Sequence, residues 1–330
     1  MVRTLSARIE RFPVRGAFTI SRGAKTHVDV VVAEVTDGMH IGRGEGTAIY
    51  YKGDCAALAL AALTGVTGAV AAGAGRGDLL ALLPAGAARN ALDCALWDLE
   101  AKQSGIRVWP RLGLPVPQPM LTAYTISLGD PAAMAAAAAA MRGRELLKVK
   151  LGGDGGAAAD MERLVAVRRA APDARLIVDA NEAWGSTDIE RTLARIAPLG
   201  VELVEQPVPA GRDAELEGLR CAVPLAADES CHDRSSLDAI VGRYRFINIK
   251  LDKAGGLTEA LALRHAAAAR GLGVMTGCML CTSLAIAPAF LVGMQGIYVD
   301  FDGPLLIEDR PHGLHFEGSD VFPPDAALWG

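Results

Sequence analysis

Six charged residues each stand at the end of a short apolar run, and their types predict acid–base chemistry around a cation. In chain order they are Lys148, Lys150, Asp179, Glu205, Asp228 and Lys250. Three carboxylates crowded together would repel one another and raise each other's pKa values, and a bound cation removes that repulsion. Because the carboxylates offer only oxygen ligands, Mg²⁺ or Mn²⁺ fits the group better than zinc.

The lysines flank the three carboxylates in the sequence, and their positions predict the type of reaction. A lysine close to a cation and to a second lysine is expected to have a lowered pKa and to act as a base near neutral pH. Lys148 precedes Lys150 by two residues, so both point the same way from a strand; Lys148 can lower the pKa of Lys150 and stabilise an oxyanion. Lys150 and Lys250 would face each other across the metal. One would remove a proton from carbon and the other would return it on the opposite face, through an enediolate.

The spacing of this series predicts the elements that position it. From Lys150 onward its members are 22 to 29 residues apart, about the length of one βα unit. Apolar strands are predicted at 121–127, 146–151, 175–180, 201–206, 223–228, 245–250, 273–278 and 296–301. Parallel strands alternating with helices close into an α/β barrel, and its reactive side chains gather at the C-terminal ends of the strands. We therefore expect a barrel domain over 119–310.

Residues 1–118 have a different pattern, which predicts an α+β domain. Strands are expected at 4–11 and 27–36, with a turn at Asp37-Gly38 and a return over 41–45. Helices are expected at 55–72, capped by Asp54, and at 87–104. The proline-rich segment PVPQP at 115–119 marks the end of this domain. The C-terminal segment, about 311–330, contains no further βα unit and is expected to run back over the first domain.

Composition and cysteine usage restrict the class of protein. The 330 residues carry a net charge of −5 with no basic tract, which argues against a nucleic-acid partner. Residues 55–75 are uncharged but rich in Ala and Gly, so a buried helix is expected there and not a membrane span.

Six cysteines without a secretion signal predict free thiols in the cytoplasm. Cys278 and Cys281 form a single C-x-x-C, which we interpret as buried or pocket-lining thiols, not as a zinc site or redox pair.

The motifs K-V-K, D-A-N, E-Q-P, D-E-S and K-L-D-K, in this order, resemble those of the enolase superfamily. The resemblance is to its muconate-lactonizing-enzyme subgroup, in which lysines stand on the second and sixth barrel strands. It implies a metal-dependent isomerase with a modified TIM barrel, (β/α)7β, and an α+β N-terminal capping domain. It also implies that Asp179, Glu205 and Asp228 bind Mg²⁺ and that Lys150 and Lys250 are the two acid/bases.

A second acidic motif, Asp300-Phe301-Asp302, lies at the end of the eighth predicted strand. By itself the pair only places two carboxylates on one side of a strand. Together with longer stretches such as LPAGAARNALDCALWDLEAK and GCMLCTS, it resembles the dipeptide epimerases, in particular those acting on L-Ala-D/L-Glu. That resemblance implies that Asp300 and Asp302 bind the free α-ammonium group of a dipeptide. It also implies inversion of the α-carbon of the C-terminal residue, and a role in the breakdown of murein peptides.

Selectivity for the second residue of the dipeptide is expected to come from a loop at about 15–26 and from loops that follow barrel strands. Arg22 resembles the arginine that pairs with a glutamate side chain in this family, and a guanidinium–carboxylate pair is a strong discriminator. Thr125, Cys278 and Met279 are expected to form walls of the pocket.

Several alternatives remain open from the sequence. N-acylamino acid racemase or o-succinylbenzoate synthase activity would use the same metal and lysines, but their substrates lack the free ammonium for which Asp300 and Asp302 are suited. A non-catalytic barrel that binds a metal or small ligand is disfavoured because every proposed catalytic position is filled. The preferred dipeptide and the oligomeric state, a homo-oligomer included, are not determined.

Overall fold

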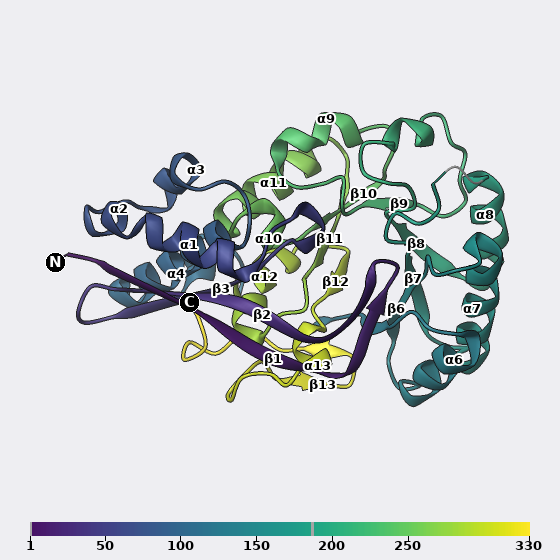
Figure 1. Ribbon diagram of the computed structural model, residues 1–330, viewed down its shortest axis with the longest axis horizontal. Coiled ribbons are helices and arrows are strands. Elements are labelled where there is room, and N and C mark those ends of the chain that lie inside the picture. Colours follow the sequence, from purple (N-terminus) through teal and green to yellow (C-terminus); the bar gives the residue numbers. More distant parts are fainter. Residues whose placement is uncertain (1, 186–187) are drawn as a thin grey trace.

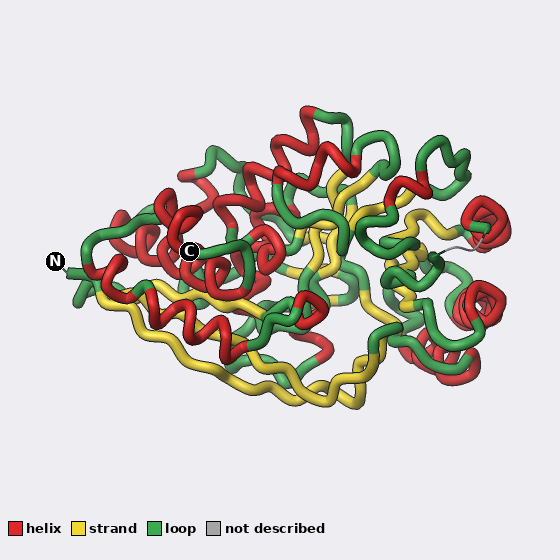
Figure 2. The backbone as a smooth tube through the Cα atoms, turned by 45° about the horizontal axis from the view of Figure 1, so that its top comes forward, coloured by secondary structure: helices red, strands yellow, loops and turns green. Residues whose placement is uncertain are grey.

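The structure is a computed structural model that describes residues 2–185 and 188–330. It contains an antiparallel sheet with helices packed on it, and an eight-stranded parallel sheet surrounded by helices (Figure 1). The long β1–β2 hairpin extends from the first region to the barrel, where its tip lies close to the ends of the parallel strands (Figure 2). The fold therefore brings an N-terminal segment to the barrel rim.

The antiparallel sheet has the order β1 (Thr4–Ile20), β2 (Gly23–Thr36) and β3 (Ile41–Thr47). The predicted loop at 15–26 is wrong, because β1 and β2 continue to pair as far as Ile20 and Gly23. Gly23 has a φ of 124°, a conformation that glycine adopts without a Cβ penalty. Only two residues, Ser21 and Arg22, connect the strands, and this places Arg22 at the tip of a hairpin.

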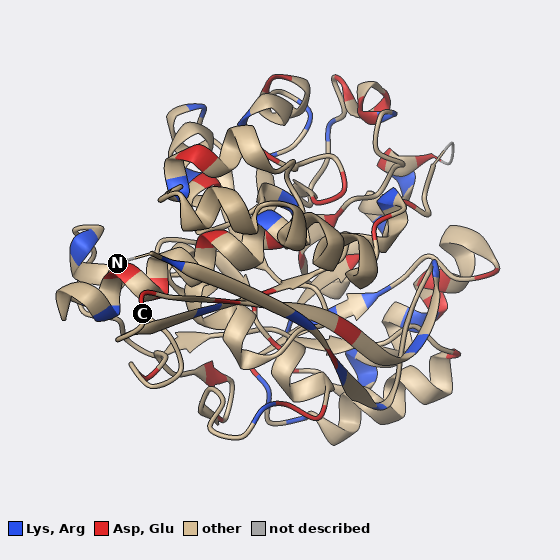
Figure 3. Ribbon diagram, turned by 60° about the vertical axis from the view of Figure 1, so that its left-hand side comes forward, with Lys and Arg blue, Asp and Glu red and all other residues tan. Residues whose placement is uncertain are grey.

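Both acidic and basic residues occur along this hairpin (Figure 3). Arg11 and Asp29 form a cross-strand ion pair with an Nε–Oδ1 distance of 2.6 Å, and Arg8 pairs with Glu10 and Glu34. Opposite charges on facing strands contribute a few tenths of a kcal/mol each, so these exposed pairs stabilise the hairpin only slightly.

Short helices and one long helix cover the antiparallel sheet. They are α1 (Ala56–Gly65), α2 (Thr67–Ala71), α3 (Leu79–Leu82), α4 (Ala87–Ser104) and α5 (Val108–Arg111). Helix α4 has the predicted bounds and lies against β3, where a Cβ on Gly44 would be 2.1 Å from the carbonyl oxygen of Ala91. Glycine at this position is therefore required for the close approach of helix and strand.

The predicted helix at 55–72 is divided in two by Val66, which lies between α1 and α2. The predicted cap by Asp54 is wrong as well, because the N-cap position belongs to Cys55 and makes no side-chain capping bond. Asp54 instead accepts a hydrogen bond from the Cys55 backbone N–H (2.8 Å). No helix within the described residues is long and apolar enough to cross a membrane.

The parallel sheet confirms the predicted barrel. Its strands, in spatial order, are β5 (Tyr124–Ile126), β6 (Leu146–Lys150), β7 (Arg175–Asp179), β8 (Val201–Glu205), β9 (Leu225–Ala227), β10 (Phe246–Ile249), β11 (Gly273–Gly277) and β12 (Tyr298–Asp300). The two ends of the sheet meet where the Ala123 N–H donates to the Val299 carbonyl (2.8 Å). The fold is thus a modified TIM barrel with an N-terminal capping domain.

Helices surround the barrel and connect its strands. They are α6 (Pro131–Ala140), α7 (Gly156–Ala170), α8 (Ile189–Ile196), α9 (Leu237–Ile240), α10 (Leu251–Ala254), α11 (Leu257–Ala269), α12 (Ser283–Gly293) and α13 (Gly303–Leu306). Below the rim, one layer of side chains fills the interior, contributed by Ala123, Leu146, Ile177, Leu203, Ala226, Met275 and Tyr298. Because side chains two residues apart share a face of a strand, the next inward positions belong to the charged series.

The C-terminal segment returns to the N-terminal region. Strand β4 (Met120–Leu121) lies outside the barrel sheet and pairs with the hairpin β13 (Phe316–Glu317) and β14 (Asp320–Val321), so the predicted first barrel strand at 121–127 is too long. Trp329 Nε1 donates to the Cys94 carbonyl of α4 (3.0 Å). The domain limits near 118 and 311 remain predictions.

Candidate active site

The strand register brings the charged series to one rim of the barrel. Lys150 on β6 is the register partner of Asp179 on β7, and Asp179 is the partner of Glu205 on β8. Asp228 and Lys250 follow the last residues of β9 and β10. Each side chain thus stands on a rigid strand end, as the spacing predicts.

Asp179, Glu205 and Asp228 form a buried carboxylate cluster. One ligand oxygen from each lies within 4.8 Å of the others. Asn248 Nδ2 donates to Glu205 Oε1 (2.8 Å), and this hydrogen bond fixes the orientation of the carboxylate. Burial and the neighbouring charge of Asp179 raise the pKa of Glu205 to about 8. Three buried oxygen donors without sulfur or imidazole fit a hard divalent cation.

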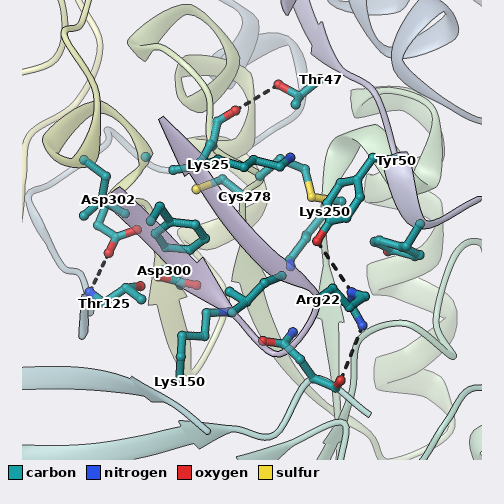
Figure 4. A pocket seen from close by; sticks show the side chains of 18 of the residues that line it. Arg22, Lys25, Thr47, Tyr50, Thr125, Lys150, Lys250, Cys278, Asp300 and Asp302 are labelled. Atoms are coloured by element: carbon teal, nitrogen blue, oxygen red, sulfur yellow. Dashed lines mark hydrogen bonds between the residues drawn. The ribbon is translucent and has the colours of Figure 1, made fainter. Parts of the chain in front are cut away.

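Lys150 and Lys250 flank this cluster on two sides. Lys150 Nζ lies 2.6 Å from Asp179 Oδ2, and Lys250 Nζ lies 2.8 Å from Asp228 Oδ2. Figure 4 shows both lysine side chains directed into one pocket from different strands. Two amino groups therefore approach the same space from separate sides.

The lowered pKa expected for Lys150 and Lys250 beside a bound cation stays a prediction, and the neighbouring carboxylates act in the opposite direction. Burial alone would lower the pKa of Lys250, but the charge of Asp228 outweighs it and raises that pKa above the ordinary value. In the same way, carboxylates led by Asp300 and Glu205 raise the pKa of the buried Lys148. A divalent cation held by the same carboxylates would oppose this effect, and the expected lowering depends on that charge.

Lys148 occupies the centre of the charged layer. Its Nζ lies 2.7 Å from Glu205 Oε2, 2.8 Å from Asp300 Oδ2 and 3.5 Å from Asp179 Oδ2. A single ammonium thus links the carboxylate cluster to the acidic pair on β12. This bridge holds the two acidic groups at a fixed separation despite their like charge.

Lys253 is a site residue that the sequence analysis missed. It is fully buried in α10, contacts both Asp228 Oδ1 and the Asp228 carbonyl, and donates to the Asn248 carbonyl (3.0 Å). The motif K-L-D-K could have indicated that Lys253 belongs to the site. Lys253 follows Lys250 by three residues, and residues three apart lie on the same side of a helical turn. Lys253 therefore holds Asp228 in place. It also gives Asp228 a second cationic partner in addition to Lys250.

Gln206 is a second residue whose position the sequence did not reveal. It follows Glu205 with a φ of 35°, an uncommon value for a residue other than glycine. Its Oε1 accepts from the backbone N–H groups of Asp228 (2.9 Å) and Ser230 (3.1 Å). Gln206 therefore ties the end of β8 to the end of β9 and fixes the distance between two of the clustered carboxylates.

Asp300 and Asp302 lie on the same face of the β12 end, and both line the pocket. Asp302 Oδ2 accepts from the Thr125 backbone N–H (2.6 Å), so Thr125 contributes its main chain to the site (Figure 4). Burial, together with the charge of Asp300, raises the pKa of Asp302 to about 7. Lys148 contacts Asp300 Oδ2, whereas the buried Oδ1 of Asp300 has no hydrogen-bond partner among the described residues and can accept a donor from a ligand.

Arg22 reaches the barrel rim from the hairpin tip. Its guanidinium donates to Glu182 Oε2 (2.8 Å) and contacts Glu229 Oε1, and it stacks on Tyr51 with 4.8 Å between Cζ and the ring centroid. Glu182 follows β7 and Glu229 follows β9. The hairpin is thus anchored to the loops that carry the carboxylate cluster.

One cavity of about 230 Å³ connects these groups. Arg22, Lys25 and Tyr50 line one side, Asp300 and Asp302 another, and Lys148, Lys150, Asp228 and Lys250 the floor. Cys278 and Met279 also line it, as expected, and Cys278 hydrogen-bonds with the buried thiol of Cys281. All six cysteines are free thiols. The pocket therefore has basic and acidic walls around a floor of three lysines and one carboxylate.

Comparison with known proteins places both parts of the chain in one family. Residues 2–113 match the mandelate racemase/muconate lactonizing enzyme N-terminal domain, and residues 130–325 match the enolase C-terminal domain-like family. The chain is 45% identical to the L-Ala-D/L-Glu epimerase of Escherichia coli (92% of this chain, 94% of that protein). It is 46% identical to an N-acetyl-D-glutamate racemase of a Pseudoalteromonas species over 77% of this chain and 79% of that protein.

A solved structure from Agrobacterium tumefaciens is also similar. It is an enolase family member with homology to dipeptide epimerases, with bound sodium and L-Ala-L-Glu. It is 50% identical to this chain and superposes with a TM-score of 0.96, covering 99% of this chain and 100% of the other. The chain therefore belongs to the mandelate racemase/muconate lactonizing enzyme family of the enolase superfamily, and it is an isomerase.

Proposed function

We propose that this protein is a dipeptide epimerase that inverts the α-carbon of the C-terminal residue, with L-Ala-D/L-Glu as substrate. The observation that carries the proposal is a pocket with an acidic pair, Asp300 and Asp302, at one side and cations at the other. Such a pocket complements a molecule with a free ammonium group and a second carboxylate. The identity with the Escherichia coli epimerase supports the same substrate.

Lys150 and Lys250 are the proposed acid/bases. One neutral lysine removes the α-proton and the protonated partner delivers a proton to the opposite face, so the substrate keeps its atoms and only its configuration changes. The intermediate is an enediolate that carries extra charge on the carboxylate oxygens. Lys148, at the centre of the charged layer, is positioned to stabilise that charge.

Asp179, Glu205 and Asp228 are the proposed ligands of Mg²⁺, with Mn²⁺ as the alternative ion. When bound, the cation would withdraw electrons from the carboxylate of the substrate and so acidify the adjacent carbon. Asn248 and Lys253 hold two of the three ligands in place. These contacts preorganise the cluster before any substrate enters.

The remaining pocket residues are proposed to position the dipeptide. Asp302 and Asp300 bind its ammonium group, and Arg22 contacts the side chain of its second residue. Thr125, Cys278 and Met279 form walls; Cys278 and Met279 are half-buried, and Thr125 is buried. We also propose a role in the breakdown of murein peptides and a cytoplasmic location, which the free thiols support.

Racemisation of an N-acyl glutamate is a second candidate, favoured by the 46% identity to an N-acetyl-D-glutamate racemase. The same lysines and carboxylates would serve this reaction. The substrates differ at the nitrogen end, because an N-acyl group carries no positive charge. A substitution of Asp302 can therefore distinguish the two functions, because only the dipeptide has a positive charge for Asp302 to bind.

Replacing Asp302 by Asn tests the dipeptide function. The variant keeps an acceptor for the Thr125 N–H but loses the charge that pairs with an ammonium group. We expect kcat/KM for L-Ala-L-Glu to fall by ~30-fold or more, as for loss of a charged hydrogen bond. Activity on N-acetyl-L-glutamate, measured in parallel by polarimetry, is expected to change little. Asp238→Asn, which removes an exposed charge, is the control. A wild type that prefers N-acetyl-L-glutamate, with an equal loss on both substrates in the variant, would favour the racemase.

The pH dependence of kcat/KM in the wild type should reflect the ionisation of the Asp302 carboxyl. Its pKa of about 7 means that the carboxyl becomes neutral as the pH falls through that value and then no longer attracts the ammonium. We expect kcat/KM for L-Ala-L-Glu to decline by about tenfold per unit below about pH 7. The profile of the Asp302→Asn variant should lack this decline. An identical acid limb in both proteins would assign the titration to another group.

A further inference from the structure

Lys25 is a second cation that enters the pocket from the β1–β2 hairpin. It is half-buried and pairs across the hairpin with Phe18, another residue that lines the cavity. Its Nζ lies 3.9 Å from the centre of the Tyr50 ring, and the Tyr50 hydroxyl lies 3.5 Å from Arg22 Nε. Figure 4 shows Lys25 and Arg22 on either side of Tyr50. Tyr50 therefore contacts both cations at the same wall of the pocket, Lys25 through its ring and Arg22 through its hydroxyl.

The two cations differ in how their charge is balanced. Arg22 contacts the carboxylates of Glu182 and Glu229, so this group of three residues has a net negative charge. Lys25 forms no ion pair with any carboxylate among residues 2–185 and 188–330. Burial and the nearby charge of Arg22 both lower the pKa of Lys25, as expected for an ammonium without a counter-ion. The uncompensated positive charge at this wall therefore belongs to Lys25.

We infer that Lys25 attracts and binds the side-chain carboxylate of the second residue of an acidic dipeptide. This inference rests on the proposed function and specifies its selectivity. The contact with the Tyr50 ring restrains the ammonium while leaving N–H donors free for a carboxylate. Arg22, held by Glu182 and Glu229, orients the hairpin tip and the same carboxylate, but Lys25 supplies the net attraction.

The test compares L-Ala-L-Glu with the nearly isosteric neutral dipeptide L-Ala-L-Gln. Replacing Lys25 by Gln should raise KM for L-Ala-L-Glu by roughly ten- to thirtyfold, the effect of one charged hydrogen bond, with little change in kcat. The constants for L-Ala-L-Gln should stay within about twofold, since no charged hydrogen bond is lost there. A dipeptide that is not turned over is measured by its competitive inhibition constant. Lys25→Arg, which restores the charge, should recover most of the affinity for L-Ala-L-Glu.

Lys52→Gln is the matched control, because Lys52 is exposed, lies in the same short helix as Tyr50 and does not line this cavity. It removes the same formal charge and should leave both dipeptides unaffected. Equal effects of Lys25→Gln on the two dipeptides, or no effect on either, would overturn the role of Lys25. If the wild type epimerised neither dipeptide, the proposed function itself would be wrong, and this outcome is distinguishable from a failure of the Lys25 inference.

Discussion

Replacing Lys150 or Lys250 by Met should lower the rate of epimerisation by ~10³-fold or more while the protein remains folded. Either variant lacks one of the two groups that must exchange a proton with the α-carbon, and no other described basic side chain occupies the same position in the pocket. The measurement is the conversion of L-Ala-L-Glu to L-Ala-D-Glu, followed by chiral chromatography. Deuterium uptake from ²H₂O should be lost for only one isomer in each variant: the variant without the lysine that faces the α-proton of L-Ala-L-Glu should lose exchange of that isomer, and the other variant should lose exchange of L-Ala-D-Glu.

The structure explains why these variants should fold. Without Lys150, Asp179 keeps Lys148 at 3.5 Å, and without Lys250, Asp228 keeps Lys253. Neither carboxylate is left as an isolated buried charge, a situation that would cost several kcal/mol. Thermal unfolding checks this point, and Lys52→Met is the control for loss of a lysine outside the site. Epimerisation at the wild-type rate in a folded Lys150 or Lys250 variant would exclude the two-base mechanism.

Removal of divalent cations should have an effect of similar size. After treatment with a chelator, we expect the rate to fall by ~10²-fold or more and to recover on addition of Mg²⁺. Binding is also measurable without activity, because a ligand specific for the native state stabilises it by about 2.7 kcal/mol at one hundred times its Kd. Addition of Mg²⁺ should therefore raise the Tm of the metal-free protein.

Glu205→Gln provides the matched variant for this prediction. It removes one ligand charge and should weaken both the rescue by Mg²⁺ and the increase in Tm. The exposed Asp238→Asn should behave as the wild type does. Full activity after complete removal of divalent cations, with no shift in Tm when Mg²⁺ is added, would contradict the assignment of Asp179, Glu205 and Asp228.

The barrel and its charged rim were predictable because both follow from periodic features of the sequence. Strand ends at intervals of one βα unit must meet on one edge of a parallel sheet, and the register of Lys150, Asp179 and Glu205 confirms this. Alternation along a strand also places Lys148 on the same face as Lys150. Such information is local and needs no knowledge of tertiary contacts.

The features that the sequence did not reveal depend on contacts between distant segments. The hairpin tip was expected to be part of a loop at about 15–26, yet its strands pair to the end. Only the folded arrangement shows that Glu182 and Glu229 offset the charge of Arg22. The pKa values of Lys148 and Lys250 likewise depend on tertiary contacts, since the balance between burial and carboxylate charge changes over distances of a few ångströms.

The most direct test of the account is to incubate the purified protein with L-Ala-L-Glu and Mg²⁺ in ²H₂O and to follow the glutamate α-proton by NMR. The account predicts deuterium at this carbon together with the appearance of L-Ala-D-Glu, and no exchange at the alanine α-carbon. Retention of the α-proton and of the L configuration, under conditions in which the protein is folded and binds Mg²⁺, would contradict it.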